Sequence, residues 1–481
     1  MLQSIKRLTK HSLIYGIGHI MSRFIGFLLL PIHTNTLSPQ SYGVAALLFS
    51  SLAILNILFS YGMDVAFLRF FTLEENKQKR CAIFSTAWWM ILVTGLVFSG
   101  ILFFSPVPFS RLIFQDAGYR VPIQLAAGIL LADALSLIPF LVLRSEEKSV
   151  HFAIIKFINV GLNVVLNVFF IVGLKLDVAG VFYANLAASA ATLLLLMPTV
   201  IPLLKWTFDQ QVLIELLKFG LPYIPSGLAV VIMDQISRFF LDRMSGKEAT
   251  GLFSATYKLG MFMAIVVAAF RFAWHPFFLS TSKQAEAKRV FSRILTYFLM
   301  VTGGLFLTIT YFLDPIIHFH LFGFRLFGQG YEGGAPIVPI VLLAYIWYGI
   351  YINFIVGVYL EKKTKYLPLV TGLGAVVSVV CNYLLIPGWG ITGAAWASFA
   401  AYGAMAIALY YVSQRFYPIA YEFKRIFLLT FVMAVFYWMG THWLTEWPLQ
   451  IFLLIMVLPV LWLVRFFSPD ELRLIKSKFR F

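Results

Sequence analysis

The stretch from residue 366 to residue 414 decides the class of fold, and it reads YLPLVTGLGAVVSVVCNYLLIPGWGITGAAWASFAAYGAMAIALYYVSQ. Its 49 residues include no Asp, Glu, Lys or Arg. A helix crosses a bilayer with about 20 mostly apolar residues, so this stretch is too long for one crossing. The turn-forming cluster Pro387-Gly388-Trp389-Gly390 lies near its centre and divides it into two helices.

The whole chain shares this composition. Hydrophobic residues make up 60% of the 481 residues and charged residues 12%, and the mean hydropathy is +0.87. Soluble domains carry roughly 25% charged residues, so an ordinary soluble fold is excluded. The two cysteines, Cys81 and Cys381, are too far apart for a disulfide framework or a metal-ligand motif. We therefore predict an all-α polytopic membrane protein with no cofactor and no metal site.

Fourteen spanning helices account for the apolar runs. Their ranges are 12–33, 42–68, 81–105, 121–143, 151–174, 179–203, 219–241, 251–276, 294–313, 335–360, 367–386, 391–413, 426–443 and 449–466. With the N-terminus inside, 27 of the 37 Lys and Arg residues, Lys156 among them, are assigned to cytoplasmic segments. The positive-inside rule then predicts that both termini are cytoplasmic. Topology accounts for most of the net charge of +16, so no nucleic-acid partner is expected.

The two halves of the chain resemble each other at an offset of about 210 residues. Three pairs of segments carry this repeat: Ser38–Gly43 with Gly246–Gly251, Ile113–Tyr119 with Leu326–Tyr331, and Val178–Ala184 with Ile391–Ala397. Parallel repeats of this kind are typical of transporters with a substrate site between the halves. We expect an N-terminal lobe at 1–208, a C-terminal lobe at 209–420, and two further helices with a cytoplasmic tail at 421–481.

Several cations lie inside predicted helices, where a charge costs at least about 2.5–3.5 kcal/mol and usually faces the bundle interior. Arg23, Arg238 and Lys258 are candidates to line a cationic cavity for an anionic head group, since arginine binds phosphate oxygens bidentately. Pairing within the protein is the alternative, because Asp234 is one helical turn from Arg238. Arg271 is expected to extend toward the lipid head groups instead.

Acidic and amide side chains raise further alternatives. Asp64, Asp133 and Asp234 are candidates for proton or Na⁺ coupling or for structural ion pairs, and the residues do not choose between these roles. Asn159, Asn163 and Asn167 form a stripe at a spacing of four residues. They are candidate sugar contacts, although amide contacts between helices are the favoured interpretation.

The opening His11-Ser-Leu-Ile-Tyr-Gly16, the segment Arg23-Phe-Ile-Gly26, and the segments Leu37–Gly43 and Gly62–Phe70 resemble the polysaccharide-biosynthesis flippases. Gly251–Leu259, Phe327-Gly328 with Tyr331, and Gly390–Ala397 agree with that resemblance. These flippases are the Wzx-like O-antigen branch of the multidrug/oligosaccharidyl-lipid/polysaccharide exporters. The resemblance implies two six-helix lobes plus two helices, which work by alternating access in the inner (cytoplasmic) membrane.

The implied activity moves an undecaprenyl- or other polyprenyl-pyrophosphate-linked oligosaccharide from the cytoplasmic to the outer leaflet. Arg23 stands where such flippases carry a cavity arginine, and Arg69 matches the family's arginine at the inner end of helix 2. Membrane lipids, H⁺ or Na⁺ as coupling ions, and glycan polymerase or export proteins are the partners that the resemblance allows.

Three alternatives remain open. A lipid II flippase and a multidrug or cation antiporter share the superfamily, and the excess of intramembrane cations over Asp argues mildly against the antiporter. A membrane-embedded glycan polymerase, ligase or acyltransferase would need a reactive constellation at one membrane face. The longest outer loop, about 314–334, offers only Arg325 and two histidines, so we expect no enzyme.

Overall fold

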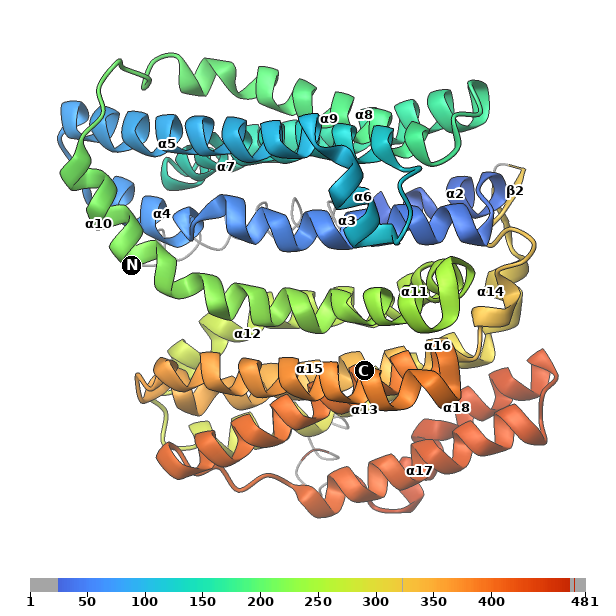
Figure 1. Cartoon of the computed structure of the whole chain (residues 1–481). Coiled ribbons are helices and arrows are strands. Elements are labelled where there is room, and N and C mark those ends of the chain that lie inside the picture. The colour runs from blue at the N-terminus through green and yellow to red at the C-terminus, as the bar shows by residue number, and fades with distance from the viewer. Residues whose placement is uncertain (1–24, 322, 468–470, 472–481) are drawn as a thin grey trace. The chain divides into compact units, whose positions relative to one another are not determined.

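The computed structural model describes residues 25–321, 323–467 and 471, which fold almost entirely into helices (Figure 1). The chain divides into two compact units. Unit 1 holds the described residues of Met1–Leu259, together with His320–Ile337 and Pro368–Ala401. Unit 2 holds Gly260–Phe319, Val338–Leu367 and the described residues of Tyr402–Phe481.

Unit 1 contains most of the long helices. They are α2 (Leu30–Thr36), α3 (Pro39–Ser60), α4 (Met63–Leu73), α5 (Lys77–Phe104), α6 (Pro106–Phe114), α7 (Arg120–Ser145), α8 (Ser149–Asn167), α9 (Asp177–Val200), α10 (Gln210–Gly220) and α11 (Ile224–Gly260). Short elements complete the unit: the π-helix Val168–Gly173, the 3-10 turns Leu221–Tyr223 and Glu332–Gly334, and the antiparallel pair β1 (His320–Leu321) and β2 (Phe324–Arg325).

Unit 2 contains α12 (Phe262–Thr281), α13 (Ala287–Tyr311), α14 (Leu313–His318), α15 (Ile337–Leu360), the 3-10 turn Thr364–Tyr366, α17 (Phe423–His442) and α18 (Trp447–Leu463). Helix α16 (Leu367–Phe416) contributes its first part to unit 1 and its second part to unit 2. Within unit 2, α13 packs against α12, α17 and α18. The guanidinium of Arg425 on α17 bonds Glu422 and Glu471, at 2.8 and 3.0 Å, and so ties Glu471 to this helix.

The helices have the length and apolarity that a bilayer requires. Eleven candidate spans occur among the described residues, and two of them, Gln210–Gly260 and Thr364–Phe416, are long enough to contain two crossings each. The 17-residue α18 is a further apolar helix, and the first predicted span, 12–33, falls mostly outside the described residues. Counted in this way, and together with α18 and the predicted span 12–33, the crossings come to 15, which is roughly consistent with the predicted 14. The chain is therefore a multi-pass membrane protein.

Local chemistry sets where several helices begin. Ser38 precedes Pro39 at the start of α3, and its hydroxyl accepts a hydrogen bond from the Ser41 amide at 3.1 Å. Asn76 and Asp209 cap α5 and α10 in the same way, each accepting from two backbone amides. Such caps satisfy amides that have no partner inside the helix.

Glycine allows the breaks within the long apolar runs. The predicted division at Pro387–Gly390 is confirmed, because Gly390 has a φ of +51° inside α16. Gly246 bends α11 in the same way, with a φ of +88°. A break in the predicted helix 42–68 was not expected. Tyr61 and Gly62 both adopt left-handed conformations there and separate α3 from α4, and any side chain at residue 62 would overlap the backbone of Gly220.

Four surface elements were not predicted: the helices α6, α10 and α14 and the β1–β2 pair. They are shorter than a membrane crossing, and a search for runs of about 20 apolar residues passes over them. Helix α10 packs against α4 and α5 of unit 1.

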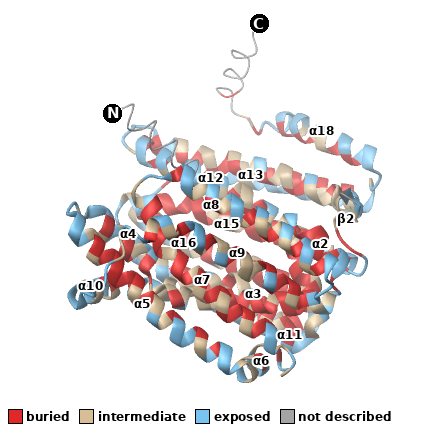
Figure 2. Ribbon diagram, turned by 90° about the horizontal axis from the view of Figure 1, so that it is seen from above, coloured by how far each residue is buried: buried red, intermediate tan, exposed pale blue. Residues whose placement is uncertain are grey.

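Helix α7 is the centre of unit 1. It packs against α3, α4, α5 and α9, and 72% of the residues in its most apolar 18-residue stretch are buried (Figure 2). Helix α8 packs mainly on α9, and only 28% of the residues in the corresponding stretch of α8 are buried. The face of α8 that does turn inward carries Asn163 and Asn167, which are 5% and 1% exposed.

Lys156, which the sequence assigns to a cytoplasmic segment, belongs to helix α8. It lies two turns inside α8, with its Nζ 4.2 Å from the centre of the Phe140 ring. Its charge interacts with that of Asp133 on α7.

The repeated segments have matching local structures within unit 1. Gly180 opens α9 and packs against the backbone of Phe170 at the end of the preceding helix. Gly393, its counterpart, follows the bend in α16 and packs against the backbone of Leu385 in the preceding part. Each glycine lets one helix end approach the next closely. The division into lobes at 208 and 420 remains a prediction.

Candidate functional site

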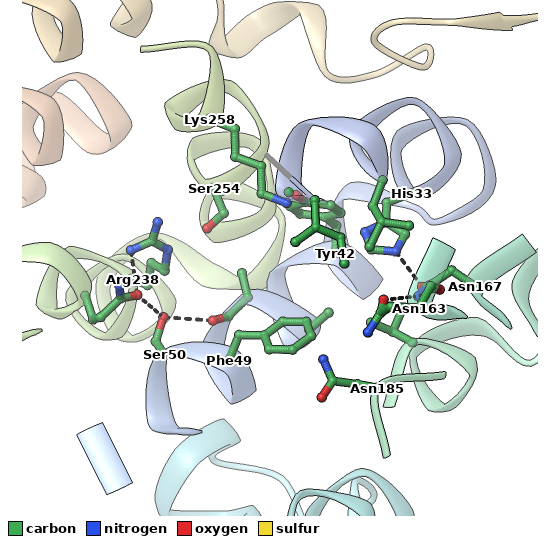
Figure 3. Close-up of a pocket in the computed structure, with 17 residues that line it drawn as sticks. His33, Tyr42, Phe49, Ser50, Asn163, Asn167, Asn185, Arg238, Ser254 and Lys258 are labelled. Carbon is green, nitrogen blue, oxygen red and sulfur yellow. Dashed lines mark hydrogen bonds between the residues drawn. The ribbon is translucent and has the colours of Figure 1, made fainter. Parts of the chain in front are cut away.

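A cavity of about 290 Å³ lies among the helices of unit 1 (Figure 3). The residues just before α2, together with α2, α3, α8, α9 and α11, form its walls. Its lining side chains are Ile25, Gly26, Leu29, His33, Tyr42, Ala45, Ala46, Phe49, Ser50, Asn163, Asn167, Val181, Asn185, Gln235, Arg238, Ser254 and Lys258. This set contains two cations and, among the described residues, no Asp or Glu.

Both cations come from α11. Arg238 is 8% exposed, and one terminal nitrogen of its guanidinium, Nη1, donates to the Asp234 backbone carbonyl at 2.7 Å and to the Gln235 side chain at 3.0 Å. The Ser50 hydroxyl of α3 donates to the same Gln235 oxygen at 2.9 Å. This chain of bonds fixes the guanidinium against α3. Its Nε and Nη2 groups donate no hydrogen bond to another described residue.

Lys258 lies five turns further along the helix, beyond the bend at Gly246. Its Nζ is 5.3 Å from the centre of the Tyr42 ring, and the lysine side chain passes 3.7 Å from where a Cβ of Gly26 would be. The ring face attracts the ammonium through its quadrupole, an interaction that leaves the N–H donors free. No carboxylate pairs with Lys258 in the part of the chain that the structure describes.

Amide and imidazole groups occupy the opposite side of the cavity (Figure 3). The Asn167 amide donates to the side-chain and backbone oxygens of Asn163, each at 2.8 Å. Its own oxygen is 2.8 Å from Nε2 of His33. Asn185, on α9, lines the same side, and within the described residues its amide has no hydrogen-bond partner.

Backbone-to-backbone contact closes unit 1 immediately beside the cavity. Gly43 packs against the Lys247 backbone, and Gly251 packs against the Pro39 backbone, so that α3 and α11 touch without side chains between them. Gly43 and Gly251 are equivalent positions in the two repeats. We call this contact, with the loop around Tyr331 described next, the seam.

The loop before α15 extends the seam. The amide of Gly328 donates to the Thr34 hydroxyl at 3.1 Å, and the Tyr331 hydroxyl donates to the Leu37 carbonyl at 2.9 Å. Burial raises the pKa of the Tyr331 hydroxyl above its ordinary value, so it stays protonated and remains a donor. Tyr42 links seam and cavity, because its ring contacts those of Tyr331 and His33 edge-on.

The predicted site residues are distributed as follows. Arg238, Lys258, Asn163 and Asn167 line the cavity. Arg23 lies outside the described residues. Arg69, in the second half of α4, is exposed, with its guanidinium 4.5 Å from the centre of the Phe219 ring.

The other polar candidates lie elsewhere. Asp64 is exposed in the first turn of α4. Asp133 lies on α7, outside the cavity lining, and its charge interacts with that of Lys156. Asp234 supplies its backbone carbonyl to Arg238. Asn159 donates to Thr192 at 2.9 Å and to the Ala188 carbonyl at 3.2 Å, so it joins α8 to α9.

Arg271, which the sequence predicts to extend toward the lipid head groups, is an exposed residue of α12. It belongs to unit 2, where its Nη1 donates to the Tyr348 hydroxyl at 3.3 Å. His33, Asn185 and Gln235 line the cavity although sequence reasoning did not select them. Asn185 is a single polar residue in an apolar run, whereas His33 and Gln235 stand beside other polar residues that draw no attention to them. The rarity of polar groups inside membrane helices is the only sequence signal that points to these three.

This arrangement can bind an anion at one side and a neutral polar group at the other. Lys258, which has no carboxylate partner among the described residues, and the Nε and Nη2 groups of Arg238 supply charge-assisted donors. The amides supply donors and an acceptor. The described residues include no group of three or more His, Cys, Asp or Glu that could hold a metal ion.

Comparison with known proteins identifies the family. Residues 8–282 match the family described as polysaccharide biosynthesis protein. A protein of the Lsg locus of Haemophilus influenzae is 23% identical over 302 residues, which span 58% of this chain and 67% of that protein.

Solved structures show the same fold. The lipid II flippase MurJ in its inward closed conformation superposes with a TM-score of 0.74 at 14% identity, covering 93% of this chain and 97% of that one. A multidrug resistance MATE family transporter of the MOP superfamily, in its inward-facing conformation, gives 0.65 at 15% identity and covers 82% and 94%. These identities show the fold alone. The family match covers more than half of the chain, and the chain therefore belongs to the polysaccharide biosynthesis protein family.

Proposed function

We propose that the protein flips a polyprenyl-pyrophosphate-linked oligosaccharide from the cytoplasmic to the outer leaflet of the inner membrane by alternating access. The membership of the chain in the polysaccharide biosynthesis family supports a precursor of this kind. The observation that carries the proposal is the pair of cations, Arg238 and Lys258, in a cavity whose described lining has no carboxylate. A diphosphate supplies the missing negative charge, and its oxygens suit both a guanidinium and an ammonium.

The alternatives fit this cavity unequally. A cation antiporter needs anionic groups where its cargo binds, and the described lining supplies none. A lipid II flippase would carry the same polyprenyl diphosphate group, so its substrate differs from our proposal only in the sugars.

Both termini are proposed to be cytoplasmic, supported by the bias of Lys and Arg between the loops.

The test is a flipping assay in proteoliposomes. A polyprenyl-diphosphate oligosaccharide is placed in one leaflet, and its arrival in the other is followed with an impermeant glycosidase, under imposed H⁺ or Na⁺ gradients and membrane potentials. Wild type is compared with Arg238→Ala and Lys258→Ala. Arg111→Ala, which removes an exposed cation on α6, is the matched control.

We expect protein-dependent flipping that persists in the control and falls at least tenfold in each cavity variant, because each loses a charge-assisted hydrogen bond. The absence of flipping by folded wild-type protein under every gradient and potential would refute the proposal. Flipping that survives both cavity substitutions would remove the cavity from the mechanism.

A further inference from the structure

The two sides of the cavity differ in chemistry. Arg238, Ser254 and Lys258 gather on α11, while His33, Asn163, Asn167 and Asn185 gather on α2, α8 and α9 (Figure 3). We call the second set the amide side. The first side carries both positive charges, and the amide side is built from uncharged amides and one imidazole. A single ligand that fills the cavity must therefore change in character from anionic to neutral polar along its length.

The hydrogen bonds of the amide side leave particular groups open. Asn167 donates through its amide nitrogen to Asn163, so its oxygen is turned to His33 and accepts from Nε2. That orientation uses both ends of the Asn167 amide, together with the side-chain oxygen of Asn163. The Asn163 NH₂ group then keeps its donors, and among the described residues nothing accepts from it.

Asn185 also has hydrogen-bonding groups that are available to a ligand. Its NH₂ and its oxygen both lack a hydrogen-bond partner among the residues that the structure describes, and the side chain lines the cavity. Amides inside a membrane protein are costly to leave unbonded, and ordinarily they bridge helices as Asn159 does. Two amides that instead turn donors and an acceptor into a cavity match a ligand with hydroxyl or acetamido groups.

Aromatic rings lie between the two sides. Figure 3 draws Tyr42 and Phe49 between the cations and the amide side, and both line the cavity. A pyranose ring has an apolar face of C–H groups and a rim of hydroxyls, so a ring packed on an aromatic face directs its hydroxyls sideways toward donors and acceptors. The cavity volume of about 290 Å³ is at the small end of ligand pockets, which run from about 300 to 1,000 Å³.

We propose that the amide side is a binding site for the first sugar of the lipid-linked glycan, a neutral sugar with hydroxyl or acetamido groups, seated next to the diphosphate held by Arg238 and Lys258. This inference rests on the proposed function. The first sugar is bonded directly to the diphosphate, so the charges that bind the phosphates bring that sugar to the amides. The limited volume excludes the rest of the glycan from this site, so the site recognises the first sugar and not the complete oligosaccharide.

Binding to two lipids tests the assignment. The purified protein in lipid nanodiscs is titrated with a bare polyprenyl diphosphate and with the same lipid carrying one N-acetylhexosamine. The readout is the ratio of the two dissociation constants, because loss of the diphosphate contacts weakens both lipids and cancels in the ratio.

Wild type is expected to bind the sugar-bearing lipid about tenfold more tightly than the bare one, as two neutral hydrogen bonds allow. In Asn185→Ala the ratio falls several-fold toward one. Asn185 makes no hydrogen bond with any described residue, so this variant keeps its fold. Asn163→Ala is expected to act in the same direction.

Asn159→Ala is the matched control, since this asparagine belongs to the same stripe but bonds Thr192 outside the cavity lining. It is expected to leave the ratio unchanged. Equal binding of the two lipids by wild type, or an unaltered ratio in Asn185→Ala, would overturn the sugar site while the diphosphate site stands. If neither lipid binds, the proposed function falls together with this inference.

Discussion

Replacing Gly251 by alanine should open the seam. A Cβ at this position would overlap the Pro39 carbonyl oxygen and would lie 2.7 Å from the Pro39 carbonyl carbon and 2.8 Å from the Gly43 nitrogen. Backbone atoms cannot turn away as a side chain can, so α3 and α11 must separate. Overpacking of this kind costs about 1–3 kcal/mol.

The penalty acts only where the two helices touch. Alanine also favours a helix over glycine by about 1 kcal/mol, but that gain is present whether the seam is closed or open and cancels between the two states. The equilibrium should therefore shift toward the open seam by about 5- to 150-fold. Gly43→Ala should act in the same way from the other repeat, because its Cβ would overlap the Lys247 backbone.

Cysteine accessibility measures this shift. Asn185→Cys places a thiol in the cavity, in a background where Cys81 and Cys381 are replaced by serine, and an impermeant maleimide is added from the side on which the seam lies, predicted to be the outside. Gly161→Ala is the control, because nothing lies within 4 Å of a Cβ at that position of α8. Faster labelling in Gly251→Ala, but not in Gly161→Ala, is expected. Equal labelling rates in folded Gly251→Ala, Gly161→Ala and the parent would show that the seam does not close the cavity on this side.

Three further predictions follow from the contacts of single residues. Arg238→Lys should weaken binding of a polyprenyl diphosphate by about tenfold in a nanodisc titration. The reason is that an ammonium replaces a guanidinium held by Gln235 and cannot bind two oxygens in parallel. Undiminished affinity would show that charge alone suffices. Lys156→Ala should lower the free energy of unfolding by about 0.5–3 kcal/mol, since it removes a cation whose charge interacts with that of Asp133. The double variant Lys156→Ala/Asp133→Ala should recover part of the loss in detergent unfolding curves, and no recovery would mean that the two charges are independent. In the cysteine-free background, Lys283→Cys should be labelled only from the cytoplasmic side and Arg111→Cys only from the outer side, and the reverse pattern would invert the proposed topology.

The agreement between sequence and structure is best where one segment alone carries the information. A bilayer requires each crossing to satisfy its own backbone hydrogen bonds, so crossings must be long apolar helices and can be recognised from length and composition. The bend at Gly390 is local in the same sense, because the residues that make it are adjacent in the chain. The short elements α6, α10 and α14 escaped prediction because they do not meet that length requirement.

The candidate site shows the opposite behaviour. Arg238 and Lys258 could be selected from the sequence because a cation in a membrane is costly wherever its helix packs. Their partners could not be selected: His33 meets Asn167 across 134 residues, and Ser50 meets Gln235 across 185. The stripe of asparagines likewise divides, with Asn159 bonded to α9 and Asn163 facing the cavity.

The sequence by itself thus determined that the chain is a bundle of membrane-spanning helices and that some of them carry cations, among them Arg238 in the predicted helix 219–241 and Lys258 in the predicted helix 251–276. A bilayer imposes its rules on each helix separately, so these features can be recognised one helix at a time. Only the tertiary structure decided which polar side chains share a cavity, that Lys156 and Asp133 interact with each other, and that Gly43 meets Lys247 where Gly251 meets Pro39. The rotation of each helix about its axis settles these contacts, and that rotation depends on packing between helices distant in the chain.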